Sequence, residues 1–241
     1  MSRLDSSTAL RAGPAWPSQC EICRQWCEGG LCADCVTRFA AAVPRCGRCG
    51  LLLGVATRAC GACLQDPPPF EHTIAAVDYG FPWDLLVSAF KFQARPELAA
   101  ALAARMAAAV GAAGLPLPDA VLPMPLAPRR LAQRGYNQAW ELARRVAAAL
   151  QLPAAWPDRL LRPLDTAPQA GLGRTARQLN LRTAFMVEPR HRASLAGRRV
   201  ALVDDVMTTG ASVREASAAL LRSGVAAVDV WVLARTPEAP A

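Results

Sequence analysis

Residues 200–212 read Val-Ala-Leu-Val-Asp-Asp-Val-Met-Thr-Thr-Gly-Ala-Ser, and this stretch decides the fold. Its first four residues are apolar and follow Gly197, as expected of a short strand buried in a parallel sheet. Two carboxylates come next, then two threonines and a glycine, and then apolar residues at helical spacing from Val213 to Leu221. Because ligands bind at the carboxyl ends of the strands of an open α/β sheet, the stretch predicts a strand, a binding loop and a helix.

The residue types in this loop suit a phosphorylated sugar. Backbone N–H groups at the start of a helix, with the hydroxyls of Thr208, Thr209 and Ser212, favour a phosphate through hydrogen bonds and the helix dipole. Asp204 and Asp205 would repel that phosphate, so we expect them to accept hydrogen bonds from ribose hydroxyls instead. The alternative is that the two acids form only a strand-end turn and a helix cap.

A basic segment follows a second buried strand, which we expect at residues 120–124. Arg129, Arg130 and Arg134 come after the end of this strand, where guanidinium groups suit a pyrophosphate. Asn137 is the expected N-cap of the helix that follows. The alternative is that the arginines are ordinary solvated side chains.

Eight of the nine cysteines form four C-x-x-C pairs. The pairs are Cys20/Cys23, Cys32/Cys35, Cys46/Cys49 and Cys60/Cys63. Two residues between thiolates allow both sulfurs to bind one tetrahedral ion, so four pairs predict about two structural zinc ions. The alternatives are buried free thiols or a redox C-x-x-C motif.

The spacing leaves open which pairs share an ion. We expect sequential pairing, because it closes the shortest loops. Cys27 has no partner in the pattern and is not an expected ligand. A closed four-cysteine site holds its module together without doing chemistry. We also expect the sheet to be distant from it, so that Cys46→Ser unfolds the module alone.

The chain divides into three expected parts. Residues 1–19 are a disordered N-terminus, 20–69 a double zinc ribbon ending at a stiff proline run, and 70–241 the α/β domain. The N-terminus has no continuous apolar stretch that would serve as a secretion signal, so we expect a cytoplasmic protein. The alanine-rich run 98–117 contains Arg105 and is expected to be an amphipathic or buried helix, not a membrane span.

The charge balance favours anionic partners. Lys and Arg number 27 against 19 Asp and Glu, a formal net charge of +8, which suits phosphates or nucleic acid. Five arginines flank the cysteines without another evident role, and they are the expected contacts if single-stranded DNA is a partner. These are Arg24, Arg38, Arg45, Arg48 and Arg58.

Taken in order, the cysteine pairs, the Pro-Met-Pro and Arg-Gly-Tyr-Asn-Gln-Ala segment at 123–139, and the Asp-Asp-x-x-Thr-Thr-Gly loop resemble the ComF family with its GntX branch. The resemblance covers residues 20 to about 235 and implies a double zinc ribbon before a type I phosphoribosyltransferase domain. It implies Mg²⁺ and phosphoribosyl pyrophosphate as cofactor and ligand, with Asp204 and Asp205 as catalytic residues. The implied ligand-binding residues are Asp204, Asp205, Thr208, Thr209, Gly210, Ala211, Ser212, Arg134, Lys91 and Arg177.

Type I enzymes carry a mobile lid, and residues 165–180 lie in the corresponding part of the chain. This segment also holds further positions similar to the family pattern. They are Gln169, Leu172, Arg174, Arg177 and Asn180. Neither the cysteine module nor residues 152–168 shows a recognisable base-binding pattern, so the acceptor stays undefined.

Three functions are consistent with these features. The first is transfer of a phosphoribosyl group to an unknown acceptor. The second is handling of single-stranded DNA, with DNA-uptake proteins as partners, because the family is associated with natural transformation. The third is regulation by phosphoribosyl pyrophosphate without catalysis.

The predicted fold is a doubly wound parallel α/β sheet preceded by the four-cysteine zinc-ribbon module. Strands are expected near residues 73–79, 120–124, 200–204 and 226–234. Helices are expected near 83–93, 97–113, 137–150 and 211–222.

Overall fold

A computed structural model describes residues 17–153, 155–163 and 184–237. Its centre is a sheet of four parallel strands in the order β3-β8-β7-β4. The strands are β3 (His72–Asp78), β8 (Ala227–Arg235), β7 (Arg199–Met207) and β4 (Ala120–Pro123). β7 and β8 lie in the middle, where every residue of β8 is buried, as is typical of strands covered on both faces.

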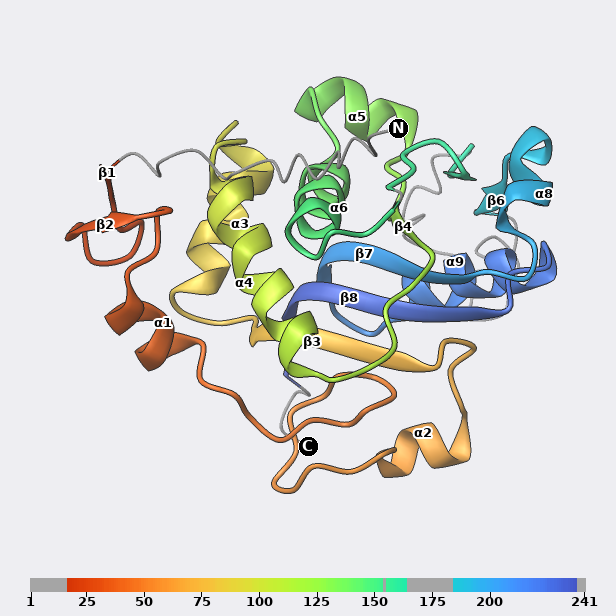
Figure 1. The fold of residues 1–241 in the computed structure, drawn as a ribbon, viewed down its shortest axis with the longest axis horizontal. Coiled ribbons are helices and arrows are strands. Elements are labelled where there is room, and N and C mark those ends of the chain that lie inside the picture. The colour runs from red at the N-terminus through yellow and green to blue at the C-terminus, as the bar shows by residue number, and fades with distance from the viewer. Residues whose placement is uncertain (1–16, 154, 164–183, 238–241) are drawn as a thin grey trace, which may run out of the picture.

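Helices cover both faces of this sheet (Figure 1). One face packs against α3 (Trp83–Phe92), α4 (Leu98–Ala112) and α6 (Gln138–Ala149). The other face packs against α9 (Ala211–Arg222). The structure therefore confirms the doubly wound parallel sheet predicted from the sequence.

Short elements connect these layers. They are α5 (Pro128–Arg134), β5 (Leu160–Leu161), β6 (Met186–Val187), the 3-10 helix η1 (Pro189–His191) and α8 (Arg192–Leu195). Helix α5 was not among the helices expected from the sequence. Its signal was present, because Pro128 occupies the first turn and Gly135 ends the helix with a φ of +80°.

None of the helices among the described residues is both long enough and apolar enough to cross a bilayer. The alanine-rich run forms α4, which buries Leu98, Leu102 and Met106 against the sheet.

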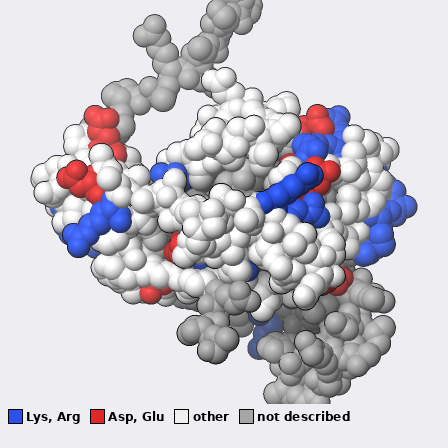
Figure 2. Space-filling view, turned by 90° about the horizontal axis from the view of Figure 1, so that it is seen from below, with Lys and Arg blue, Asp and Glu red and all other residues white. Residues whose placement is uncertain are grey.

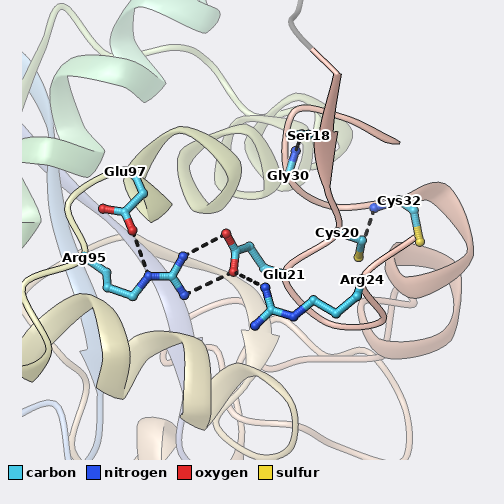
Figure 3. A network of polar contacts seen from close by, with 8 residues as sticks. All are labelled: Ser18, Cys20, Glu21, Arg24, Gly30, Cys32, Arg95 and Glu97. Atoms are coloured by element: carbon cyan, nitrogen blue, oxygen red, sulfur yellow. Dashed lines mark hydrogen bonds and ion pairs between the residues drawn. The ribbon is translucent and has the colours of Figure 1, made fainter. Parts of the chain in front are cut away.

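The first ribbon, residues 17–39, consists of β1 (Pro17–Gln19), β2 (Trp26–Glu28) and α1 (Ala33–Phe39). β1 comes from the end of the segment expected to be disordered and pairs with β2. Glu21 joins the ribbon to the α/β domain, because Arg95 donates to both of its oxygens at 2.9 and 3.1 Å and to Glu97 at 2.7 Å (Figure 3).

The second ribbon, residues 45–66, ends in α2 (Gly61–Gln65) and lies along β3, the edge strand of the sheet (Figure 1). Thr73 N donates to Gly47 O at 3.0 Å, and Thr73 Oγ1 donates to Arg48 O at 2.6 Å. A Cβ on Gly50, whose φ is +69°, would come within 2.8 Å of Thr73 Cγ2. The expectation that the sheet is distant from this module is therefore wrong, because the ribbon covers the sheet's edge.

Candidate functional site

Two acids, Asp204 and Asp205, lie near the carboxyl end of β7. The strand was expected to stop at residue 204 but continues to Met207, so both acids lie within its last four residues. Asp205 is 2% exposed, and its Oδ1 lies 3.0 Å from Lys91 Nζ at the end of α3. Its Oδ2 is buried without a hydrogen-bond partner among the described residues. Asp205 thus has one oxygen paired with Lys91 and a second oxygen that is buried without a hydrogen-bond partner among the described residues.

The environment of Asp204 favours its neutral form. Burial, and then the charge of Asp205, raise the pKa of Asp204 to about 8, although the N–H of Asp205 and the charge of Lys91 oppose this shift. Protonation of one acid relieves the repulsion between two adjacent carboxylates.

This raised pKa makes stability depend on pH. A carboxyl group whose pKa is higher in the folded chain favours folding while it is protonated, so its contribution is lost as the pH rises from 3.8 through about 8. We expect Asp204→Asn to raise the free energy of unfolding of the ligand-free protein near pH 9 by at least about 1.4 kcal/mol, the equivalent of one pKa unit. Near pH 5 the change should be smaller. Urea denaturation at both pH values measures it.

The matched control is Asp34→Asn, which removes an exposed acid on α1. It should leave stability unchanged within about 0.5 kcal/mol at either pH. If Asp204→Asn behaves like this control at both pH values, Asp204 is not held neutral by burial.

Residues 208–212 form the loop that leads into α9. Gly210 is the N-cap residue with a φ of +77°, and a Cβ there would lie 2.6 Å from Met207 Cε. Since glycine has no side chain to cap the helix, backbone N–H groups of the first turn stay open to a ligand. Thr208 and Thr209 are exposed, and Thr209 Oγ1 accepts from Ala211 N at 3.4 Å. The loop thus leaves hydroxyls and backbone N–H groups available, and its role as a phosphate site stays a prediction.

Three cationic side chains line a cavity that reaches the acid pair through Lys91. Lys91, Arg130 and Arg134 line a cavity of about 480 Å³, and the Arg134 guanidinium lies 5.2 Å from the ring centre of Phe92. α5, which carries both arginines, is held close by Tyr136, whose hydroxyl donates to Phe90 O. The strand-end position of the arginines thus brings them to Lys91.

The N-cap predicted at Asn137 is confirmed. Its Oδ1 accepts from Ala139 N and Trp140 N, while its Nδ2 donates to Met124 O. Arg177 and the lid expected at 165–180 lie outside the described residues, as do Gln169, Leu172, Arg174 and Asn180.

The eight paired cysteines form two clusters with the sequential pairing that was predicted. Cys20, Cys23, Cys32 and Cys35 form the first cluster, and Cys46, Cys49, Cys60 and Cys63 form the second. The sulfurs of each cluster lie within 4.8 Å of one another, and sulfurs from different knuckles are 3.6 and 3.8 Å apart. A tetrahedral zinc ion with bonds of about 2.3 Å requires sulfurs about 3.8 Å apart, so both clusters fit structural zinc. Cys27 belongs to neither cluster.

Backbone N–H groups favour the thiolate form of one cysteine in each cluster. Cys32 N and Cys60 N donate to Cys20 Sγ and Cys46 Sγ at 3.4 and 3.2 Å. Burial raises the pKa of both thiols, but the backbone N–H groups around them outweigh it and lower the pKa of Cys20 to about 6 and of Cys46 to about 7. The thiolate is the form that binds zinc.

A third group of possible ligands, Glu71, His72 and Asp229, lies at the opposite end of the sheet. Arg199 donates to Glu71 at 2.7 Å and to Asp229 at 3.0 Å, and His72 lies 3.0 Å from Asp229. The charges of this group are balanced by arginine, so we interpret it as a structural network.

Two arginines expected to contact DNA have structural partners. Arg45 donates to Asp78 at 2.7 Å and to Gly50 O at 3.1 Å, and Arg48 donates to Pro68 O at 2.7 Å. The expectation that Arg45 and Arg48 have no other role is therefore wrong. Arg24, Arg38 and Arg58 remain exposed.

Arg235, at the end of β8, was not among the site residues expected from the sequence. Its Nε donates to Cys49 O at 3.0 Å, and its Nη1 lies 2.5 Å from Thr208 O and 3.1 Å from Met207 O. The side chain thereby connects the second ribbon to the 208–212 loop. Its place at the end of a buried strand next to β7 was the available signal.

The fold and the two clusters define the class: a parallel α/β domain with helices on both faces of its sheet, preceded by a ribbon module whose two four-cysteine clusters fit structural zinc. Sequence comparison gives 39% identity over 228 residues to DNA utilization protein YhgH of Salmonella typhi, covering 91% of this chain and 98% of that protein. Competence protein F of Haemophilus influenzae is 36% identical over 212 residues, covering 86% and 91%. The chain belongs to the ComF family.

Among solved structures, glutamine phosphoribosylpyrophosphate amidotransferase from B. subtilis matches 58% of this chain and 26% of its own, with a TM-score of 0.38 and 18% identity. The protein TT1426 from Thermus thermophilus matches 58% of this chain and 84% of its own, with a TM-score of 0.31 and 23% identity. No family model matches the chain.

Proposed function

We propose that the chain binds phosphoribosyl pyrophosphate with Mg²⁺ and transfers its ribose 5-phosphate unit to an acceptor. The contact between Lys91 and Asp205 carries this proposal, because it brings a cationic cavity directly against the acid pair. The 208–212 loop follows the acid pair in the chain. One end of a strand thus presents groups for a phosphate, for hydroxyls and for a pyrophosphate.

In this arrangement the 5′-phosphate lies on the 208–212 loop, where N–H groups and threonine hydroxyls donate to it. The ribose 2′ and 3′ hydroxyls donate to the acid pair, Asp204 and Asp205. The pyrophosphate lies in the cavity formed by Lys91, Arg130 and Arg134, whose side chains balance its charge.

Transfer breaks the bond between C1′ and the pyrophosphate oxygen, and both electrons of that bond leave with pyrophosphate. A lone pair of the acceptor forms the new bond to C1′. The carboxylates stabilise the positive charge that grows on the ribose ring, and the cations stabilise the leaving group.

Magnesium enters this proposal with the ligand. Mg²⁺ is commonly held by one or two carboxylates together with substrate phosphates. Asp204 and Asp205 would hold such an ion together with the pyrophosphate oxygens, and it would supply positive charge near the leaving group.

The test compares two ligands, one with a pyrophosphate group and one without it, so that contacts to the pyrophosphate are measured separately. Arg134→Ala should weaken binding of phosphoribosyl pyrophosphate, measured by calorimetry with Mg²⁺, by about ten-fold, because a charge-assisted hydrogen bond contributes about 1.5 to 3 kcal/mol. Binding of ribose 5-phosphate, which lacks the pyrophosphate, should change less than about two-fold.

Arg129→Ala is the matched control, since this arginine lies on the same helix α5 but does not line the cavity. It should bind both ligands like the wild type. Absence of binding by the wild-type protein would overturn the proposal. Binding without pyrophosphate release from any tested acceptor would instead support a regulator.

Handling of single-stranded DNA is the second candidate function, and the names of the relatives favour it. Arg24, Arg38 and Arg58 are exposed on the ribbons, although Arg24 lies 3.5 Å from Glu21. On the face shown in Figure 2, basic side chains form separate groups, several of them beside acidic ones. We therefore expect binding through scattered contacts, with DNA-uptake proteins as further partners.

Salt dependence tests this function. DNA affinity falls with salt concentration along a straight line on a log-log plot, and each phosphate contact contributes roughly 0.7 to the steepness of that line. Replacing Arg24, Arg38 and Arg58 by Ala should therefore reduce the magnitude of the slope by up to about two. Affinity for phosphoribosyl pyrophosphate should not change. If the wild-type protein does not bind a single-stranded oligonucleotide at about 50 mM salt, this function is excluded.

A further inference from the structure

A cavity of about 450 Å³ lies between the inter-ribbon linker, residues 40–44, the edge strand β3 and the helix α4. Apart from Arg45, Thr73 and Arg105, every residue that lines it is apolar, and none is acidic. Small-molecule sites occupy roughly 300 to 1,000 Å³ and are lined mostly by apolar side chains with a few polar groups. This cavity has that size and composition, and it contains no residue of the acid pair or of the 208–212 loop.

Arg105 brings a positive charge without a counter-ion to this cavity. It is the only charged residue of α4 and lies on the same face of the helix as Ala109 and Ala112, which also line the cavity. Its Nε is buried, and no acid or carbonyl oxygen in the described parts of the chain pairs with the side chain. Because buried polar atoms in folded proteins nearly always have a partner, an unpartnered guanidinium beside a cavity favours an acceptor atom from a ligand.

Arg45 adds further N–H groups from the ribbon side. Its side chain is 14% exposed, and its Nη1 donates to Asp78 and to Gly50 O. Its Nε and Nη2 donate to no described residue. Asp78 balances the charge of Arg45, so the two arginines together leave one positive charge unbalanced, that of Arg105. A ligand with one negative charge matches this site.

We propose that this cavity binds a small organic carboxylate with an apolar body. A carboxylate carries a single charge, and its two oxygens match the planar fork of N–H groups that a guanidinium presents. The alanine side chains and Val43 give the cavity an apolar wall, which suits an alkyl body and offers no donor to a second charged group. The bound ligand thus contacts both the linker between the ribbons and the α/β domain.

Octanoate is the probe, because it carries one carboxylate on an alkyl chain. It should bind the zinc-loaded full-length protein saturably at one site per chain, measured by calorimetry. Octan-1-ol has the same chain without a charge and should bind about ten-fold more weakly, because its hydrogen bonds to the arginines are not charge-assisted on both sides. Inorganic phosphate has no apolar body and should not displace octanoate.

Arg105→Met tests the charge, because it keeps a long side chain on α4 and removes the guanidinium. It should weaken octanoate binding about ten-fold, the loss expected for a charge-assisted hydrogen bond, and should change octan-1-ol binding by less than about two-fold. Arg192→Met is the matched control, since this arginine is exposed on α8 and does not line the cavity. It should bind both probes like the wild type.

Ala109→Phe tests the space, because this partly buried residue lines the cavity and a larger side chain there occupies it. It should abolish binding of both probes. Ala108→Phe is the matched control on the same helix, because Ala108 is exposed and does not line the cavity. It should bind both probes fully. Equal unfolding temperatures of the two ligand-free variants show that α4 is intact.

Three results would overturn the proposal. The first is absence of saturable octanoate binding up to about 10 mM. The second is octanoate affinity in folded Arg105→Met equal to that of the wild type, which also decides the matter if Ala109→Phe does not fold. The third is displacement of octanoate by inorganic phosphate at equal concentration, which would show an anion site without preference for an apolar body.

Discussion

Replacing both acids, Asp204→Asn with Asp205→Asn, should weaken binding of phosphoribosyl pyrophosphate by at least ten-fold. Each acid is proposed to accept a hydrogen bond from a ribose hydroxyl, and the bond to the ion-paired Asp205 carboxylate alone contributes about 1.5 to 3 kcal/mol, as expected for a charged group. Asp205 also holds Lys91 in place through the 3.0 Å ion pair, so its replacement disturbs the pyrophosphate site as well. Calorimetry with Mg²⁺ measures the loss.

The double variant leaves Lys91 partly buried without its partner, which lowers stability. Lys91 also lines the proposed pyrophosphate cavity and is therefore kept in the variant, and urea denaturation of the double variant shows whether it is folded under the conditions of the binding measurement. A control for net charge is Glu28→Gln with Asp34→Asn, which removes two exposed acids of the first ribbon. Full affinity in a folded double variant would show that the acid pair does not hold the ribose.

Cys46→Ser and Cys20→Ser form a matched pair with different expected consequences. Each removes one ligand of a four-cysteine cluster, so each should reduce zinc from about two ions per chain to about one. Structural zinc contributes about 10 to 16 kcal/mol in zinc-finger peptides, so the affected ribbon should unfold in either variant. Elemental analysis and thermal unfolding measure both effects.

Only Cys46→Ser should weaken phosphoribosyl pyrophosphate binding strongly, by about ten-fold, the loss expected when one charge-assisted hydrogen bond breaks. The second ribbon holds Arg235 through Cys49 O, and Arg235 holds the 208–212 loop through Thr208 O. The first ribbon is joined instead to Arg95, between α3 and α4. Equal losses in the two variants would contradict this connection.

The local sequence pattern was sufficient to predict those elements whose formation depends only on residues close together in the chain. The apolar run before the acids predicted β7, and the expected helix at 211–222 agrees with α9 (Ala211–Arg222). The C-x-x-C spacing predicted both clusters, because two residues between thiolates determine the knuckle whatever surrounds it. The side-chain oxygen of Asn137 caps α6 as expected, since capping involves only neighbouring residues.

Contacts between distant segments could not be predicted in this way. The pairing of Lys91 with Asp205 joins α3 to β7, and Arg235 joins β8 to the second ribbon. Arg45 and Arg48 looked like free surface charges, because Asp78 and Pro68, their partners in the fold, lie 20 or more residues away.

The sequence by itself thus determined the parallel α/β fold, the two four-cysteine clusters and the strand that carries the acid pair. Each of these follows from periodicity or spacing over a few residues. Only the tertiary structure decided which cations face the acids, that the second ribbon covers the edge of β3, and that a cavity forms between the inter-ribbon linker and α4. These features depend on the order in which parallel strands assemble, because that order sets which strand ends and loops become neighbours.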